Sequence, residues 1–403
     1  MRIATICNLP PPFGGAEVFA KELCLRLSQK GTEVSIITHK LFEIQLTDKL
    51  DVLRYPYAPR QQLNVFQQDI KIYPVFTTSY VGKTIGENAE NIDEKLVKEI
   101  KEVFLREKPD LVHCHFTTKK TKEVLNVCRK MKIPLVVTLH GMIDLVPMYD
   151  SHICEGLTSD KILSLLKLCT RIVVVSEQML EYCRGKGLTN VYRIPNGIDR
   201  KYFSPVNHVE RKGILYVGKL NKHKGLKETL PAYLKIKNMI KGDLCLVGRG
   251  INKEMFEKTS FFLNSDQKVK MEELIKKGRV HLLEELNPSD LRKLYRKCKL
   301  LVLPSLTEGF PLVILEALSC GTPVIASDVG AISEVIQNGK NGYCIPKGDS
   351  DELARAIMKM FKNYHSGLKK LCRDSVNDYE IAKITDSYFN LFQDILKAGK
   401  END

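Results

Sequence analysis

Short apolar runs alternate with longer amphipathic stretches along most of the chain. In the first half, the apolar runs indicate strands, and several of the stretches between them have helical spacing. The expected strands cover 3–7, 34–38, 111–115, 135–139, 172–175 and 191–194, and the expected helices cover 15–30, 94–106 and 119–130. This alternation predicts an α/β fold with a doubly wound parallel sheet. The stretch 41–90 has weaker periodicity and predicts no element.

A Pro/Asn/Gly break at 195–199 and a polar, turn-rich stretch at 204–213 indicate a linker, after which the alternation resumes. Strands are expected at 213–217, 243–247, 280–283, 300–304, 322–326 and 342–345, and helices at 226–239, 288–296, 351–361 and 381–396. We therefore expect two Rossmann-like domains, 1–203 and 204–380. The C-terminal helix, about 381–403, is expected to pack back on the first domain.

The composition is that of a soluble globular chain. Its 403 residues suggest two or three domains, and a hydrophobic content of 43% with 27% charged residues is ordinary for such proteins. No stretch reaches the roughly 18 uninterrupted apolar residues of a membrane span. The apolar run 3–7 is too short for a signal peptide and predicts a first strand instead. We expect a cytoplasmic protein.

Cysteine usage and charge narrow the possible partners. The twelve cysteines include no CxxC pair and no zinc-like spacing, so we expect reduced core thiols in a cytosol. The net charge of +14 is spread over both halves, without a basic tail or a basic patch interleaved with aromatic residues. This argues against a nucleic-acid partner. Weak peripheral contact with the inner membrane face fits better, although a solvated lysine-rich surface remains the simplest explanation.

Two glutamates, Glu308 and Glu316, flank a Gly-Phe-Pro turn between an expected strand and an expected helix. Pro311 suits the first turn of a helix, and apolar helical spacing continues to Leu318. A helix that begins after a strand offers free amides and a positive dipole end to a phosphate. Glu308 could accept hydrogen bonds from sugar hydroxyls, and Glu316 could reach a ribose diol. Taken alone, such a pair is more often simply solvated.

A glycine-bounded loop with three lysines, 218–225, directly follows the expected strand 213–217. Ligands of doubly wound folds bind at the carboxyl ends of strands, and lysines there can neutralise a diphosphate. The loop is neither a Walker motif nor a G-x-G-x-x-G fingerprint. Taken alone, it is more typical of a lysine-rich surface turn than of a phosphate site.

With three further motifs, these two loops resemble the retaining glycosyltransferases of family four. The further motifs are G-G-A-E at 14–17, P-N-G-I-D at 195–199, and G-T-P-V-I-A at 321–326, which is followed by Gly330 and Glu334. All five follow the order and spacing of the family. The resemblance implies the GT-B fold, in which two Rossmann-like domains face each other across a cleft.

The resemblance also implies a role for individual residues. Lys219 and Lys224 would bind the diphosphate; the family usually has arginine where this chain has Lys219, so the bidentate fork is lost. Glu308 and His140 would contact the donor sugar, and these four residues form the expected catalytic set. The expected donor-binding residues are Gly14, Gly15, Gly218, Gly309, Phe310, Leu312, Val313 and Glu316. His113 and His115 are expected to be structural.

The resulting hypothesis is a retaining glycosyltransferase that moves a hexosyl unit from a nucleoside diphosphate sugar to a glycan, lipid-linked or small-molecule acceptor. The family implies front-face attack, with the departing phosphate helping to deprotonate the acceptor. No Asp-x-Asp dyad lies in a suitable place, so neither a metal nor another cofactor is expected. The alternatives are a sugar-nucleotide epimerase of the same architecture and a non-catalytic partner subunit of a transferase. The donor sugar, its base and the acceptor stay open.

Overall fold

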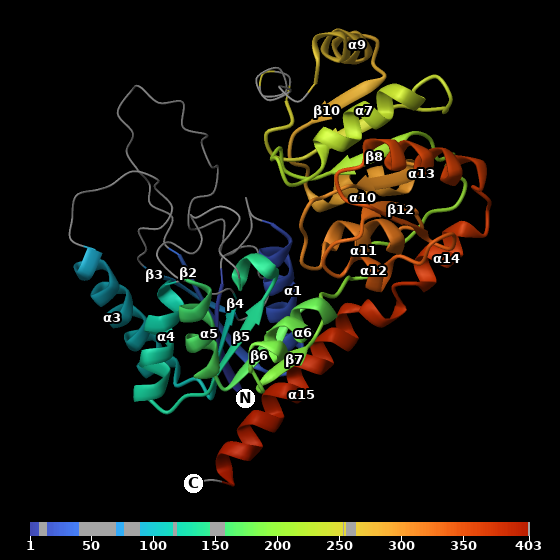
Figure 1. Ribbon diagram of the computed structural model, residues 1–403. Helices are drawn as coiled ribbons and strands as arrows, with labels where there is room; N and C mark the ends of the chain where they lie inside the picture. The colour runs from blue at the N-terminus through green and yellow to red at the C-terminus, as the bar shows by residue number, and fades with distance from the viewer. Residues whose placement is uncertain are drawn as a thin grey trace. The chain divides into compact units, whose positions relative to one another are not determined.

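The computed structural model describes residues 1–7, 14–39, 70–75, 89–115, 119–145, 158–252, 254 and 263–401. The chain forms two compact units (Figure 1). Unit 1 comprises Met1–Val175, Met179–Ile194 and Thr385–Asp403, and unit 2 comprises Ser176–Gln178 and Pro195–Ile384. The boundary expected from the sequence lies after residue 203. In the structure the chain passes into unit 2 at Pro195 and returns to unit 1 at Thr385.

Within its described residues, unit 1 contains a seven-stranded parallel sheet in the order β3-β2-β1-β4-β5-β6-β7. The strands are β1 (Arg2–Ile6), β2 (Glu33–His39), β3 (Lys71–Val75), β4 (Leu111–His115), β5 (Leu135–Leu139), β6 (Arg171–Val174) and β7 (Val191–Arg193). The helices are α1 (Gly15–Gln29), α3 (Ala89–Glu107), α4 (Lys119–Lys130), η1 (Met142–Asp144), α5 (Ser159–Lys167), α6 (Glu177–Gly185) and α15 (Ile381–Lys400). In the register, Ile3 lies between Val34 and Leu111.

The described part of unit 2 holds a six-stranded parallel sheet in the order β10-β9-β8-β11-β12-β13. The strands are β8 (Ile214–Val217), β9 (Leu244–Val247), β10 (Val280–Leu283), β11 (Leu300–Leu303), β12 (Val324–Ser327) and β13 (Gly342–Ile345). The helices are α7 (Leu226–Ile236), α9 (Ser265–Lys276), α10 (Pro288–Lys297), α11 (Leu312–Ser319), α12 (Ile332–Val335), α13 (Ser350–Lys362), α14 (Leu368–Asp374) and η3 (Asn377–Tyr379). The predicted α/β class with two Rossmann-like units is confirmed.

The central strands of both sheets are covered on both faces. Every residue of β4, β5, β8, β11 and β12 is buried. Parallel strands with helices on both sides need such continuous apolar runs, and this is why these strands were readable from the sequence. Among the described residues, none of the helices combines the length and the apolar content needed to span a bilayer.

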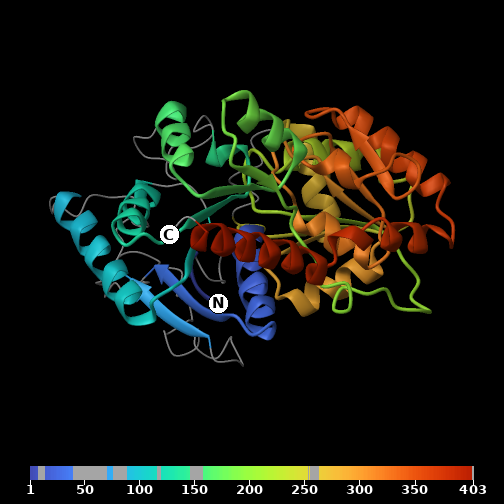
Figure 2. The ribbon, with the colours of Figure 1, turned by 90° about the horizontal axis from the view of Figure 1, so that it is seen from below.

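The last long helix, α15, contributes side chains to the core of unit 1. Its residues from Thr385 belong to that unit, where α15 runs beside α1 (Figures 1 and 2). The Tyr388 ring lies 6.0 Å from the Phe19 ring and 5.5 Å from the His113 ring. An ion pair between Lys30 and Asp386 joins the same two helices at the surface. Part of the first unit is therefore supplied by the far end of the chain.

Candidate active site

Two loops at the carboxyl ends of neighbouring strands of unit 2 pack on one another. We call 218–225, which follows β8, the lysine loop, and 304–311, which follows β11, the glutamate loop. Because β8 and β11 are adjacent in the sheet, the two loops leave it side by side. The Leu306 amide donates a hydrogen bond to the His223 carbonyl over 2.8 Å. Of the six expected donor-binding residues of unit 2, Gly218, Gly309 and Phe310 lie in these two loops, and the other three lie on α11.

Gly225 allows the close approach of the two loops. It caps α7 with a left-handed backbone, φ +78°. A Cβ atom at this position would lie 2.1 Å from the Pro304 carbonyl oxygen. Both the torsion and the contact therefore require glycine. A similar requirement holds at Gly330, φ +61°, where a Cβ would lie 2.3 Å from the Glu308 carbonyl oxygen.

Lys224 and Glu308 form an ion pair between the two loops. Lys224 Nζ lies 2.7 Å from Glu308 Oε1. The glutamate side chain is 8% exposed and the lysine side chain 29%, so solvent screens this pair less than a pair at the open surface. The structure thus brings together two residues that the sequence analysis placed in the catalytic set.

Lys219 and Gly218 begin the lysine loop. Lys219 is exposed, whereas Gly218 is half-buried, and a Cβ on Gly218 would lie 2.9 Å from the Tyr216 hydroxyl oxygen. The next residue anchors the loop, because the Leu220 amide donates to the Arg249 carbonyl over 2.9 Å. The loop is thus held against the turn that follows β9.

The glutamate loop leads into α11, which begins at Leu312. Pro311 is the N-cap, with ψ 116°, and not a residue of the first turn as expected, because its extended backbone places it just outside the helix. Leu312 and Val313 occupy the first turn, where amide groups have no acceptor within the helix. The positive end of the helix dipole lies at the same place. The N-terminus of α11 can therefore interact favourably with an anion.

Phe310 is buried and held by the P-N-G-I-D segment. The Asn196 side-chain amide donates to the Phe310 carbonyl over 2.9 Å, and the Tyr379 ring lies 5.2 Å from the Phe310 ring. The Gly309 carbonyl accepts a hydrogen bond from the Ala331 amide over 2.9 Å. These contacts fix the backbone just before α11.

Glu316 lies on α11 and accepts a hydrogen bond from Tyr295. The phenol oxygen lies 2.7 Å from Glu316 Oε2. Burial raises the pKa of Glu316 to about 7, while the Tyr295 hydrogen bond opposes that rise. Near neutral pH, this carboxyl group therefore exchanges between its protonated and ionised forms.

In unit 1, His140 follows β5 and contacts a second histidine. Its Nε2 atom lies 2.9 Å from His115 Nδ1, and the two rings are stacked. The backbone amides of His140 and Gly141 donate to one oxygen of Asp144, over 2.7 and 3.2 Å. Burial lowers the pKa of His140 to about 3 and raises that of Asp144 to about 6. His140 is therefore neutral at physiological pH.

His113 lies deeper in unit 1 and is completely buried. Its Nε2 atom is 2.8 Å from the Thr138 hydroxyl, which in turn lies 3.3 Å from the Tyr388 hydroxyl of α15. Burial lowers the pKa of His113 to about 3. His115 is also buried, 3% exposed. Both histidines are thus part of the packed interior of the unit.

Gly14 and Gly15 begin α1. Gly14 is the N-cap, with φ −85° and ψ −170°, a backbone conformation that is open to any residue, and Gly15 is the first helical residue. The segment 8–13 before them lies outside the described residues. One turn further along, the Phe19 ring lies edge-on to His140, with the ring centroids 6.0 Å apart. These glycines therefore begin the helix that packs against His140.

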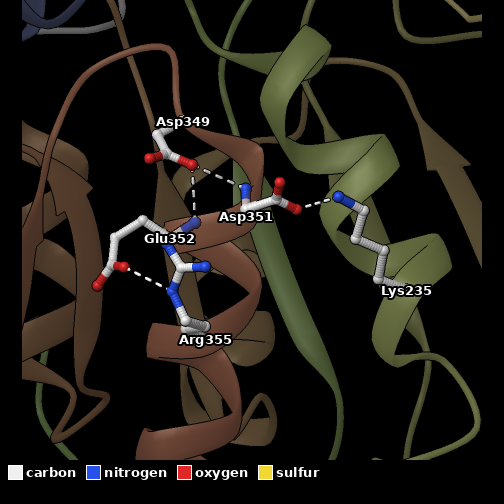
Figure 3. A network of polar contacts seen from close by, with 5 residues as sticks. All are labelled: Lys235, Asp349, Asp351, Glu352 and Arg355. Carbon is white, nitrogen blue, oxygen red and sulfur yellow. Dashed lines mark hydrogen bonds and ion pairs between the residues drawn. The ribbon is translucent and has the colours of Figure 1, made fainter.

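The chain contains one Asp-x-Asp sequence, Asp349 to Asp351, and it caps a helix (Figure 3). Asp349 accepts hydrogen bonds from the backbone amides of Asp351 and Glu352 at the start of α13. Asp351 pairs with Lys235 of α7. Across the described ranges, His, Cys, Asp and Glu side chains form no group of three that could hold a metal ion.

The sequence analysis missed two tyrosines that contact candidate site residues. Tyr216 donates to the Lys224 carbonyl over 2.9 Å, and Tyr295 donates to Glu316. Both are fully buried, and Tyr216 lies within the strand expected at 213–217. A hydroxyl in an otherwise aliphatic run was the available signal, since a buried phenol needs a partner.

Two family models match the chain, and together they cover most of it. The model described as Glycosyltransferase Family 4 matches residues 13–202, and the model described as Glycosyl transferases group 1 matches residues 199–375. The two matches meet near the linker expected from the sequence. Each therefore corresponds to one Rossmann-like half.

Curated relatives match over comparable lengths. The N-acetyl-alpha-D-glucosaminyl L-malate synthase of Bacillus anthracis is 25% identical, over 99% of this chain and 98% of its own. The UDP-Gal:alpha-D-GlcNAc-diphosphoundecaprenol alpha-1,3-galactosyltransferase of Escherichia coli is 26% identical, over 75% and 80%. Among solved structures, Anabaena HepE in complex with UDP superposes with a TM-score of 0.71 at 17% identity, over 98% of this chain and 100% of its own. That last likeness shows the shared fold.

Proposed function

Because the chain belongs to the group 1 glycosyltransferases of the family 4 kind and has the GT-B fold, we propose that it transfers a hexosyl unit from a nucleoside diphosphate sugar with retention of anomeric configuration. Glycosyl transfer is the activity of the family. The donor class, the hexosyl unit and retention are the proposed part.

The observation that carries the proposal is the placement of Lys224 beside Glu308. An amine and a carboxylate lie 2.7 Å apart at the carboxyl ends of two strands, and the glutamate loop continues into the N-terminus of α11. A diphosphate needs positive charge and free amides, whereas a sugar needs hydrogen-bond acceptors. These two loops supply both kinds of group.

In the proposed reaction, the bond between the anomeric carbon and the β-phosphate oxygen breaks, and the bonding electrons stay with the phosphate. Lys224, Lys219 and the first amides of α11 then stabilise the negative charge that develops there. The acceptor hydroxyl attacks from the face that the phosphate leaves, and its proton passes to a departing phosphate oxygen. Attack from that face preserves the anomeric configuration.

Glu308 and Glu316 are proposed to position the donor. Glu308 would accept hydrogen bonds from sugar hydroxyls and Glu316 from the ribose diol. The hydrogen bond that Tyr295 donates to Glu316 orients the carboxyl group of that glutamate. The amines of the lysine loop would then bind the central diphosphate, and the two glutamates would bind the sugar and the ribose on either side of it.

The acceptor is proposed from the relatives. One relative is named as a synthase of N-acetyl-alpha-D-glucosaminyl L-malate, and another as a galactosyltransferase that acts on a diphosphoundecaprenol-linked sugar. These names support a small-molecule or lipid-linked acceptor for this chain. The described cysteines are all free and nine of them are buried, which supports work in a reducing compartment such as the cytosol.

The test is a thermal-shift screen of UDP-, GDP- and ADP-sugars, followed by product analysis with and without acceptors. A true donor raises the unfolding temperature by mass action. Analysis of the product by NMR should show the anomeric configuration of the donor. Inversion at the anomeric carbon would contradict retention.

Conversion of the donor without any acceptor would point to the epimerase alternative. The screen uses L-malate and an undecaprenyl-diphosphate-linked sugar as acceptors. Failure of every nucleotide sugar to stabilise the protein would contradict the proposed donor class.

A further inference from the structure

The backbone of Lys224 is held by a tyrosine from the sheet. Tyr216 of β8 is completely buried, and its hydroxyl donates to the Lys224 carbonyl over 2.9 Å. Helix α7 does not use that carbonyl, because its first acceptor is the Gly225 carbonyl, bonded to the Thr229 amide over 2.9 Å. Tyr216 therefore supplies the Lys224 carbonyl with a hydrogen-bond donor that α7 does not provide.

Both ends of the lysine loop meet at this hydroxyl. A Cβ atom on Gly218 would lie 2.9 Å from the Tyr216 hydroxyl oxygen and 3.5 Å from Lys224 Cβ. Glycine at position 218 thus lets the loop close over the phenol, while the Lys224 carbonyl accepts a hydrogen bond from the same hydroxyl group. The loop is tied to its own preceding strand.

Lys224 is consequently held at its two ends by different parts of unit 2. Its carbonyl is bound by Tyr216 and its amine by Glu308. A four-carbon side chain has many rotamers, so the place of its amine depends on how firmly the backbone is held. We propose that Tyr216 is a positioning residue for Lys224, and that its hydroxyl sets the place of the amine that meets the donor diphosphate. This inference rests on the function proposed above.

The surroundings of Tyr216 make it a permanent hydrogen-bond donor. Burial raises the pKa of its phenol well above the usual value, and the nearby Glu308 and Glu228 carboxylates raise it further. The hydroxyl therefore keeps its proton throughout the physiological range. Its role is to hold the carbonyl, and it exchanges no proton with the substrate.

The chain offers a matched control for removal of this hydroxyl. Tyr233 is also buried in unit 2, and its hydroxyl donates to the Arg279 carbonyl over 3.1 Å. Arg279 directly precedes β10, so this bond lies at the amino end of that strand and not at its carboxyl end. Tyr216→Phe and Tyr233→Phe each delete one buried hydroxyl-to-carbonyl bond, and only the first bond involves the lysine loop.

The experiment measures the affinity of both variants for UDP, GDP and ADP by calorimetry. Tyr216→Phe should weaken the binding of whichever diphosphate the wild type binds by roughly fivefold, the value of one ordinary hydrogen bond. Tyr233→Phe should leave that affinity within about twofold of the wild type. Equal losses in the two variants would overturn the inference.

A double-mutant cycle separates positioning from a merely structural role. In a Lys224→Ala background there is no amine to place, so Tyr216→Phe should have no further effect on diphosphate affinity. An undiminished loss in that background would show that the tyrosine acts independently of the lysine, and would overturn the inference.

Gly218→Ala gives a second route if Tyr216→Phe does not fold, because the new methyl group pushes on the same hydroxyl from the loop side. The loss of affinity should be similar and should be smaller in the Lys224→Ala background, where only a direct effect of residue 218 on the donor remains. Failure of the proposed function gives a different result, in which the wild type binds none of the three diphosphates. If the wild type binds a diphosphate but the double-mutant cycle shows no coupling between Tyr216 and Lys224, only the positioning role of Tyr216 is rejected.

Discussion

The amine of Lys224 lies 2.7 Å from the carboxylate of Glu308, and the carboxylate is the more deeply buried partner. The lysine is therefore partly neutralised by a residue of the neighbouring loop. A diphosphate that approaches Lys224 has to compete with this carboxylate and is repelled by it. On the proposed function, the two residues would have opposing effects on phosphate binding, even though both would contact the same donor.

Glu308→Gln should separate these effects. Removal of the negative charge frees the lysine amine, so a nucleoside diphosphate should bind roughly fivefold more tightly, equivalent to about 1 kcal/mol. Turnover of the complete nucleotide sugar should fall, because the sugar loses a strong acceptor. Calorimetry with the diphosphate checks the expected gain in affinity, and steady-state kinetics with the sugar nucleotide check the expected loss of turnover. Weaker binding of the diphosphate would contradict the competition. Glu352→Gln, which breaks the exposed pair with Arg355, serves as the control.

Lys224→Ala should lower kcat/KM by roughly two to three orders of magnitude, comparable to the loss of one donor from an oxyanion hole. The physical reason is that the charge proposed to develop on the departing phosphate would lose one of the two lysine amines that stabilise it. Lys222→Ala removes an exposed lysine from the same loop and should change kcat/KM by less than about threefold. Similar kinetics of the two variants would argue against a specific role for Lys224.

Gly225→Ala should destabilise unit 2 by at least about 3 kcal/mol, because a methyl group would clash with the Pro304 carbonyl at a left-handed backbone position. Gly278→Ala is the matched control. It has a similar torsion, φ +67°, but open space around its Cβ, so only about 1 kcal/mol of strain is expected. Thermal unfolding compares the two variants, and equal losses would mean that the loops do not need to approach so closely.

Glu316→Gln should change how the stability of unit 2 depends on pH. The pKa of Glu316 is about 7 in the folded protein against an ordinary value of 4.5. Between pH 4.5 and about pH 7, Glu316 is ionised in the unfolded chain but keeps its proton in the folded protein. The free energy of unfolding therefore falls as the pH rises through this range, and it levels off above about pH 7. The glutamine variant lacks this fall and should gain on the order of 2 kcal/mol relative to the wild type, after allowance for solvent screening.

The comparison between pH 4.5 and pH 8 is made by chemical denaturation. Glu272→Gln, a substitution of the same kind at an exposed position of α9, serves as the control. A constant offset between Glu316→Gln and the wild type at all pH values would contradict the raised pKa.

Much of the secondary structure could be read from the chain because the parallel strands are buried on both faces. The buried central strands β4 and β5 have the bounds that the sequence predicted, and so do the partly buried edge strands β10 and β13. Strand β3, Lys71–Val75, was missed because it lies in the stretch 41–90, where the hydrophobic period is weak. Most of that stretch lies outside the described residues. Helix α7 ends at Ile236, three residues before its expected end.

The candidate site was predictable only in its local parts. A strand, a polar loop and a helix are adjacent in sequence, so Glu308 and Glu316 could be placed from the chain alone. Partners from other elements could not be placed in this way. The contact between Tyr216 and Lys224 depends on a turn in the loop, and the contact between Thr138 and Tyr388 joins residues 250 positions apart.

The participation of α15 in unit 1 bears on the order in which the protein is made. Tyr388 and Phe392 pack against His113, which the ribosome releases much earlier. The interior of the first unit therefore stays incomplete while all of unit 2 is synthesised. Unit 2 can reach its native packing first, and the core of unit 1 is completed only when the residues from Thr385 emerge.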